Sequence, residues 1–222
     1  RRFVAMNNQW LVSGLKAIST LLLAGGLTGV AVGSETPAKP TADAKAGEAK
    51  AGTICLACHG PQGNSIVPTW PKLAGQHPAY IYKQLMDFKS GACVNDQMSP
   101  QVIPLNEQDF LDLAAYFAAQ QQTPGAADPA LAELGERIYR GGNPQSGVAA
   151  CTGCHGPAGT GIGLAKFPRI AGQHAQYVDQ SLRHFRDAAR ANDPNNMMRG
   201  VSSRMTDQEI AAVSQYIQGL SQ

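Results

Sequence analysis

Residues 55–61 read Cys-Leu-Ala-Cys-His-Gly-Pro, and residues 151–157 read Cys-Thr-Gly-Cys-His-Gly-Pro. The similarity continues downstream, because Trp-Pro-Lys-Leu-Ala-Gly-Gln-His at 70–77 returns as Phe-Pro-Arg-Ile-Ala-Gly-Gln-His at 167–174. Two matched blocks at a nearly constant offset indicate an internal duplication. We therefore expect the 222-residue chain to contain two homologous domains.

The register of the repeat extends beyond these blocks. Asn95 matches Asn192, 97 residues later, whereas Met98 matches Met198, 100 residues later. An insertion of three residues just before Met198 explains the change of offset. Residues 123–129, with two prolines and a glycine, have the composition of a linker. The predicted domains are therefore residues 44–122 and 130–222, joined by the linker 123–129.

The amino-terminal part of the chain reads as a targeting segment. Three basic residues precede an apolar run at 21–32, which is shorter than the roughly 20 residues that a membrane span needs. We expect residues 1–33 to be a signal peptide, or an anchor if they are not cleaved. Residues 34–43 have the composition of a disordered linker. Export of this kind predicts a periplasmic protein.

Both halves have helical periodicity, with no stretch of alternating polar and apolar residues. Thr206 and Glu209 have the spacing of a capping box, and Asn106 takes the place of Thr206 in the first half. The sequence thus predicts an all-α fold. The expected helices are 44–54 and 129–140, then 79–89 and 176–190, then one behind each cap. The last pair should bury Phe110, Leu113, Ala114 and Phe117 in one half, and Ile210, Val213 and Ile217 in the other.

The Cys-x-x-Cys-His motif is the attachment signature of haem c. Cys55 and Cys58 can form thioethers with the two vinyl groups of one porphyrin edge, which leaves His59 beneath the iron as an axial ligand. The second motif supplies Cys151, Cys154 and His155 in the same way. The predicted cofactors are therefore two covalently bound haem c groups.

Other readings of the motif fit less well. A structural zinc site needs four ligands, whereas each motif offers two cysteines and one histidine. A thioredoxin-like motif belongs in a βαβ unit, which the helical pattern does not provide. A disulfide between cysteines three positions apart is strained. Cys93 has no counterpart in the repeat, and we expect it to be a free thiol.

The second axial ligand should come from a repeated position. Met98 and Met198 are the methionines that the repeat superimposes, in loops ahead of the last helices, with Met197 as an alternative one residue away. Ligation by histidine and methionine raises the reduction potential. It also occupies both axial positions, so we expect an electron carrier with no catalytic residues and no small-molecule substrate.

Pro71 and Pro168 follow the haem histidines by 12 and 13 residues. A carbonyl at this place can accept the Nδ1–H of the histidine and orient the ring, a role outside the first coordination shell; the alternative is a simple turn proline. His77 and His174 are alternative iron ligands, but matched methionines favour a structural, capping or propionate-binding role for them.

Charge excludes one class of function. The net charge of +2 is small, and the basic residues form no stripe along the sequence. Nucleic-acid binding therefore has no electrostatic basis. The run Arg183, Arg186, Asp187 and Arg190 reads as a solvated helix face that can also contact a partner.

The chain resembles the dihaem cytochrome c4 family over residues 44–222. The resemblance rests on the two Cys-x-x-Cys-His units, the paired Pro-Lys/Arg-Leu/Ile-Ala-Gly-Gln-His blocks, the methionine loops and the ending Tyr-Ile-Gln-Gly-Leu at 216–220. It implies two class I cytochrome c domains related by a pseudo-twofold axis. It also implies iron ligation by His59 and Met98 in the first domain, and by His155 and Met198 in the second.

The same resemblance implies the partners. Members of the family are periplasmic, either soluble or peripherally associated with the membrane, and carry electrons from a quinol-oxidising cytochrome bc complex towards a terminal oxidase. Two other functions compete with a free carrier. A dihaem peroxidase needs one open axial position, which the matched methionines disfavour, and a dedicated subunit of a larger dehydrogenase or oxidase is compatible with the sequence.

Overall fold

The computed structural model describes residues 41–221, so the predicted signal peptide and all but the last three residues of the predicted linker 34–43 lie outside the described residues. This part of the chain is all-α, as predicted, with two isolated β-bridges and no strand. None of its helices has the length and apolarity needed to cross a bilayer. The α-helices are α1 (Ala44–Ile54), α2 (Leu56–His59), α3 (Pro78–Ser90), α4 (Met98–Val102), α5 (Glu107–Ala118), α6 (Pro129–Gly141), α7 (Thr152–His155), α8 (Ala175–Arg186), α9 (Met197–Ser202) and α10 (Asp207–Gly219), and the short 3-10 helices are η1 (Pro61–Gly63), η2 (Gly163–Ala165) and η3 (Pro194–Asn196).

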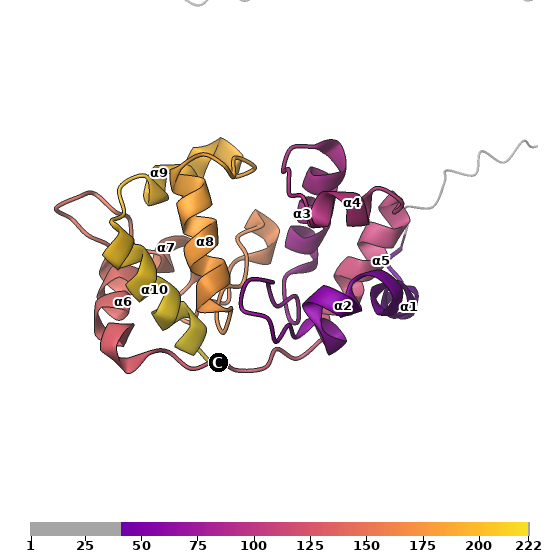
Figure 1. The fold of residues 1–222 in the computed structure, drawn as a ribbon, viewed down its shortest axis with the longest axis horizontal. Coiled ribbons are helices and arrows are strands. Elements are labelled where there is room, and N and C mark those ends of the chain that lie inside the picture. The colour runs from indigo at the N-terminus through magenta and orange to yellow at the C-terminus, as the bar shows by residue number, and fades with distance from the viewer. Residues whose placement is uncertain (1–40, 222) are drawn as a thin grey trace, which may run out of the picture. The chain divides into compact units, whose positions relative to one another are not determined.

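The helices form two lobes with separate apolar cores. In the first lobe (residues 41–122), α5 packs against α1 and α3, and in the second lobe (residues 129–221), α10 packs against α6 and α8 (Figure 1). The predicted inward faces of the last helices form the centre of each core. Phe110 and Leu113 are each 1% exposed, and Ile210 is fully buried. The repeat in the sequence is thus a repeat in the structure.

A glycine lets the first and last helices of each lobe cross closely. A Cβ atom built on Gly47 would lie 2.1 Å from the carbonyl oxygen of Asp112, and one on Gly135 would lie 2.2 Å from that of Ala212. Any larger side chain would force the helices apart, because real Cβ contacts are not this short. The capping boxes then fix where the last helices begin, at Asn106 and Thr206.

Two local features differ from the prediction. The helix expected over 176–190 ends at Arg186, because Ala188 adopts a left-handed conformation with φ of 57°. Gly91 has a φ of 78° at the same repeat position of the first lobe, and a glycine there is a recognisable signal for the end of a helix. Met98 and Met198, expected in loops, instead belong to the short helices α4 and α9.

The two lobes are joined by a reciprocal pair of glutamines. The side-chain amide of Gln76 donates to the carbonyl of Arg169 at 2.8 Å and accepts from its N–H at 2.9 Å. Gln173 does the same to the backbone of Lys72, at 3.0 and 2.9 Å. Because all four residues belong to the repeated Lys/Arg-Leu/Ile-Ala-Gly-Gln motif, each copy of the motif binds the other copy.

The histidines that follow these glutamines also reach across. The Nε2–H of His77 donates to the carbonyl of Thr160 at 2.7 Å, and that of His174 donates to the carbonyl of Ser65 at 2.8 Å. Both residues precede the first turn of a helix, α3 or α8, but neither side chain caps that helix. The structural role expected for His77 and His174 is therefore contact between the lobes.

Candidate haem-binding sites

Each Cys-x-x-Cys-His motif forms a single helical turn. Cys55 directly precedes α2 and Cys151 directly precedes α7, so that the two cysteines of a motif are one turn apart. The first cysteine of each motif, Cys55 or Cys151, is half-buried, and we call it the inner cysteine. The second, Cys58 or Cys154, is exposed. None of these four cysteines forms a disulfide within the described residues. The two sulfur atoms of each motif thus differ in their exposure, and both would be needed to hold a porphyrin through its two vinyl groups.

The histidine of each motif is held by a backbone carbonyl. The Nδ1 atom of His59 lies 2.9 Å from the carbonyl oxygen of Pro71, and that of His155 lies 3.0 Å from that of Pro168. A carbonyl can only accept, so Nδ1 must carry the proton. In a neutral imidazole the lone pair is then on Nε2, the nitrogen available to a metal.

Burial favours the neutral form of both imidazoles. His59 is 6% exposed and His155 is 8% exposed. Burial lowers the pKa of each imidazole, an effect only partly opposed by the proline carbonyl. A neutral ring with a fixed tautomer is the form that binds iron. The residues of both motifs therefore fit a haem group.

Burial also favours the protonated form of the inner thiols, Cys55 and Cys151. Burial, followed by the neighbouring Cys58, raises the pKa of the Cys55 thiol to about 11. Burial likewise raises the pKa of Cys151 to about 11. Thioether formation joins a thiol to a vinyl group, so a protonated, unoxidised thiol suits the attachment.

Each predicted methionine lies in the apolar cluster of its own lobe. Met98 packs against the cluster that also contacts Cys55, and Met198 packs against the cluster that also contacts Cys151. Met197, the alternative to Met198, is 37% exposed and is not part of that packing. Each lobe thus offers a histidine nitrogen from its motif and a methionine thioether that packs against the same apolar cluster as the motif's first cysteine.

Tyr139 is a residue near the second motif that the sequence did not single out. It is fully buried, and its hydroxyl donates to the carbonyl of Gly156, the residue after His155, at 2.6 Å. The repeat places Ala51 at the equivalent position of α1, and a small hollow beside Cys55 is lined by Ala51 in the first lobe. Because the two copies differ here, the repeat gave no signal for this contact.

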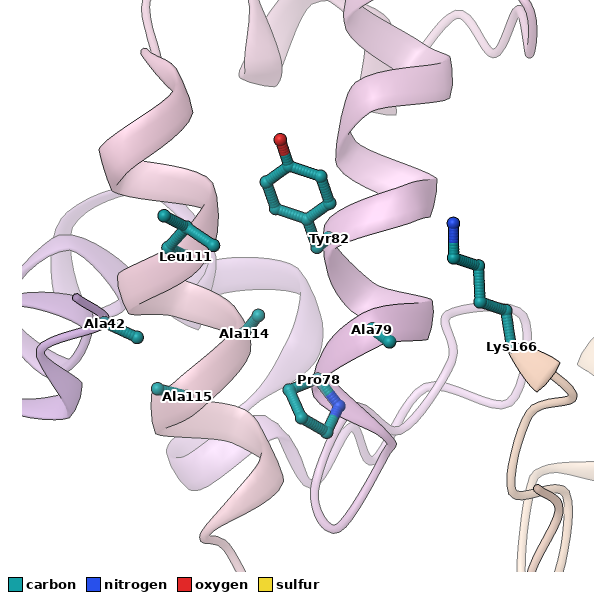
Figure 2. A pocket seen from close by; sticks show the side chains of 8 residues that line it. All are labelled: Ala42, Pro78, Ala79, Tyr82, Leu111, Ala114, Ala115 and Lys166. Atoms are coloured by element: carbon teal, nitrogen blue, oxygen red, sulfur yellow. The ribbon is translucent and has the colours of Figure 1, made fainter. Parts of the chain in front are cut away.

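A second hollow lies away from the motifs. It is an apolar depression between α3 and α5, lined by Pro78, Tyr82, Leu111 and Ala114, with Lys166 of the second lobe beside it (Figure 2). No cysteine, histidine or methionine lines it. This depression is therefore not a haem site.

The basic run of the second lobe is only partly the solvated face that was expected. Arg183 and Arg186 lie on α8 and both pair with Asp207, at 2.6 and 2.7 Å. Arg190 lies beyond the end of α8 and donates to the hydroxyl of Tyr80 in the first lobe at 3.1 Å. The interpretation is wrong for Arg190, because the helix ends four residues earlier than its periodicity suggests.

Comparisons with known proteins agree with this geometry. The family model for cytochrome c matches the chain twice, at residues 44–121 and 132–221. The cytochrome c4 of Thiocapsa roseopersicina is 65% identical over 191 residues, which cover 86% of this chain and 99% of that protein. A protein of Stutzerimonas stutzeri described as a thiosulfate dehydrogenase electron acceptor is 33% identical, over 96% of this chain and 95% of its own length.

The fold has a solved counterpart. The crystal structure of reduced recombinant cytochrome c4 from Pseudomonas stutzeri superimposes with a TM-score of 0.79 at 46% identity. The match covers 82% of this chain and all of that one. Both domains therefore have the cytochrome c fold, and the pair carries two covalently bound haem c groups. The chain belongs to the cytochrome c4 family of dihaem electron-transfer proteins.

Proposed function

We propose that this protein is a periplasmic carrier that takes electrons from a quinol-oxidising cytochrome bc complex and passes them towards a terminal oxidase. In this proposal each iron is bound by a histidine and a methionine, His59 with Met98 and His155 with Met198. Cys55, Cys58, Cys151 and Cys154 hold the porphyrins through thioethers.

One observation carries the proposal. In each lobe a methionine lies in the same apolar cluster as the inner cysteine of the motif. With an imidazole on one side and a thioether on the other, an iron has no axial position left for a substrate. Such a site exchanges electrons only, which supports a carrier rather than an enzyme.

The haem supplies a one-electron couple when it is bound, and the protein tunes and positions it. The carbonyls of Pro71 and Pro168 orient the histidines, which sets the ring plane and the basicity of Nε2. Because Cys58 and Cys154 are exposed, a porphyrin attached to them would have one edge near the surface of each lobe. A partner can approach that edge without entering the protein.

The proposed location rests on the leader. Residues 1–33 have the charge and apolar run of an export signal, and c-type haem attachment in bacteria takes place after export. If the leader is kept as an anchor, the protein is held at the membrane surface beside its partners. Intact mass of the purified protein distinguishes the two forms by the presence or absence of this segment.

A second candidate has a specific observation in its favour. The relative described as a thiosulfate dehydrogenase electron acceptor is similar to this chain over nearly its whole length. This chain could accordingly serve one dehydrogenase rather than a quinol-oxidising complex. The fold and the haem sites are the same in both cases, and only the donor differs.

The test compares donors on the oxidised holoprotein. Stopped-flow reduction by a purified cytochrome bc complex with quinol should be fast and should reduce both haems, whereas thiosulfate with thiosulfate dehydrogenase should be slow. The opposite order would replace the proposed donor. Carbon monoxide added to the reduced protein at neutral pH should not bind, and rapid binding of one equivalent would overturn the carrier assignment.

A further inference from the structure

The segments that lead to the two methionines are held differently. We call residues 91–97 the first methionine loop and residues 187–196 the second methionine loop. In the first, Asn95 accepts hydrogen bonds from the backbone of Gln97 and Met98, at 3.0 and 2.9 Å. The described hydrogen bonds of this loop all stay within the first lobe.

The second methionine loop instead binds the other lobe. The side-chain amide of Asn192 donates to Gln84 at 3.0 Å and to Asp87 at 2.7 Å, both on α3. Lys83, also on α3, donates to the backbone carbonyl of Asn192 at 2.8 Å and pairs with Asp87. The side chains of Lys83 and Asp87 are only 15% and 18% exposed, so the contact is largely shielded from water.

A second contact lies beside the first. Arg190 donates to the hydroxyl of Tyr80 on α3 at 3.1 Å and to the side chain of Asn192 at 3.1 Å, and its guanidinium stacks on Phe185 at 4.7 Å. The second methionine loop thus contacts one face of α3, because residues at this spacing lie on the same side of a helix. The four contacting residues are Tyr80, Lys83, Gln84 and Asp87.

The anchored residue is connected to the methionine through a buried ion pair. Asp193 follows Asn192, and its carboxylate accepts from the side chain of Arg199 at 2.7 Å and from its backbone N–H at 3.0 Å. The Asp193 side chain is 3% exposed. Because Arg199 directly follows Met198, a continuous chain of contacts joins Asn192 to the methionine through Asp193, its charge-assisted pair and Arg199.

The repeat shows that this arrangement is one-sided. Asp96 and Ser99 take the places of Asp193 and Arg199 in the first lobe, so the ion pair has no equivalent there. Asp96 is exposed. Gln180 takes the place of Lys83 on α8, and it too is exposed. The first lobe therefore binds the methionine loop of the second lobe, whereas no described hydrogen bond joins the first methionine loop to the second lobe.

We propose that α3 of the first lobe positions the distal methionine of the second haem, with Lys83, Asp87 and Asn192 as the positioning residues. The proposal rests on the histidine and methionine ligation proposed above. It makes the strength of one Met–Fe bond depend on hydrogen bonds between the lobes, while the loop before the other methionine is hydrogen-bonded only within its own lobe. Opening the contact should loosen the second site selectively.

The experiment measures methionine displacement in the holoprotein. Cyanide competes for the ferric iron, and the ε-methyl proton resonances of the ligating methionines report each haem separately in the ferrous protein. Asn192→Ala and Lys83→Met should speed displacement at the second haem about tenfold, the effect of losing about one charge-assisted hydrogen bond, and should leave the first haem unchanged. Lys83→Arg, which keeps the donor, should restore most of the difference.

Gln180→Met is the matched control, because it introduces the same residue at the equivalent exposed position of α8, and it should alter neither haem. Lys83→Met lies in the other lobe and keeps the test open if Asn192→Ala does not fold. Two methionine resonances in the wild type with unchanged displacement in the variants would overturn this inference alone. A wild type lacking either resonance would overturn the ligation scheme first.

Discussion

The carbonyl oxygen of Ala212 on α10 lies against Gly135 on α6, where a Cβ atom would be only 2.2 Å away. The contact is with backbone, which cannot rotate aside as a side chain can. We therefore expect Gly135→Ala to separate the two helices and to lower the free energy of unfolding by about 1–3 kcal/mol, the usual cost of overpacking. Chemical denaturation monitored by circular dichroism measures this loss.

Gly141→Ala in the same helix is the control, because nothing lies within 4 Å of its Cβ position. Alanine is the better helix former by about 1 kcal/mol, so this variant should be equal to or more stable than the wild type. Equal stability of the two variants would mean that α6 and α10 are farther apart in solution than in the structure.

The identity of the second axial ligand gives a sharp pair of variants. Met198 packs against the same apolar cluster as Cys151, whereas its neighbour Met197 is 37% exposed. Met198→Ala should abolish the Met-to-iron absorption band of the second haem, and Met197→Ala should leave it unchanged. The reverse result would move the ligand by one residue.

The reciprocal glutamines predict that the lobes unfold together. Gln76 and Gln173 are 8% and 6% exposed, and each makes two hydrogen bonds to the backbone of the other lobe. Replacing either by alanine leaves buried backbone groups unpaired and should cost about 2 kcal/mol. Calorimetry should then show two transitions in place of one.

Gln176→Ala is the control for this pair, because Gln176 is exposed on α8. It should retain the single transition. A single transition in the Gln76 and Gln173 variants as well would place the coupling between the lobes elsewhere.

Glu209 predicts how stability depends on pH. Burial alone would raise the pKa of this carboxyl, but hydrogen bonds from Asn143 at 2.6 Å and Thr206 at 2.8 Å outweigh it and hold the pKa below its usual value. A depressed pKa stabilises the fold above the ordinary glutamate pKa of about 4.3, and this stabilisation is lost as the pH falls through the lower folded value.

Glu209→Gln should therefore be less stable than the wild type at neutral pH and should lose less stability on acidification. Thermal unfolding of both proteins at about six pH values between roughly pH 7 and pH 3 measures how the stability of each depends on pH. Glu133→Gln, at an exposed ion pair on α6, should follow the wild-type slope. Parallel slopes for Glu209→Gln and the wild type would contradict the assignment.

Much of the fold follows from the sequence because the duplication provides its own control. The α1 helix has the predicted bounds, Ala44–Ile54, and the capping residues Asn106 and Thr206 begin the last helices as expected. Spacing alone pointed to the carbonyls of Pro71 and Pro168 as possible partners of the histidines. In the structure they lie within hydrogen-bond distance of Nδ1.

What the sequence did not reveal is what differs between the copies. Ala188 ends α8 although alanine is the best helix former, because the chain must turn there as it does at Gly91. Tyr139 and Asn192 make contacts with residues distant in the sequence, and the partner of a tyrosine or an asparagine cannot be predicted from its residue type. Such contacts depend on how two finished helices or lobes meet, which periodicity does not encode.

The close crossing of the first and last helices has a consequence for assembly. Within each lobe the two helices that must meet stand at opposite ends of the sequence, so the chain has to close a long loop before either buries its apolar face. In the proposed ligation the porphyrin is bound to cysteines that follow the first helix, and its iron is bound to a methionine that precedes the last helix. The haem would then act as a cross-link that shortens the loop between the two helices. It would therefore lower the conformational entropy that the polypeptide loses when the helices meet.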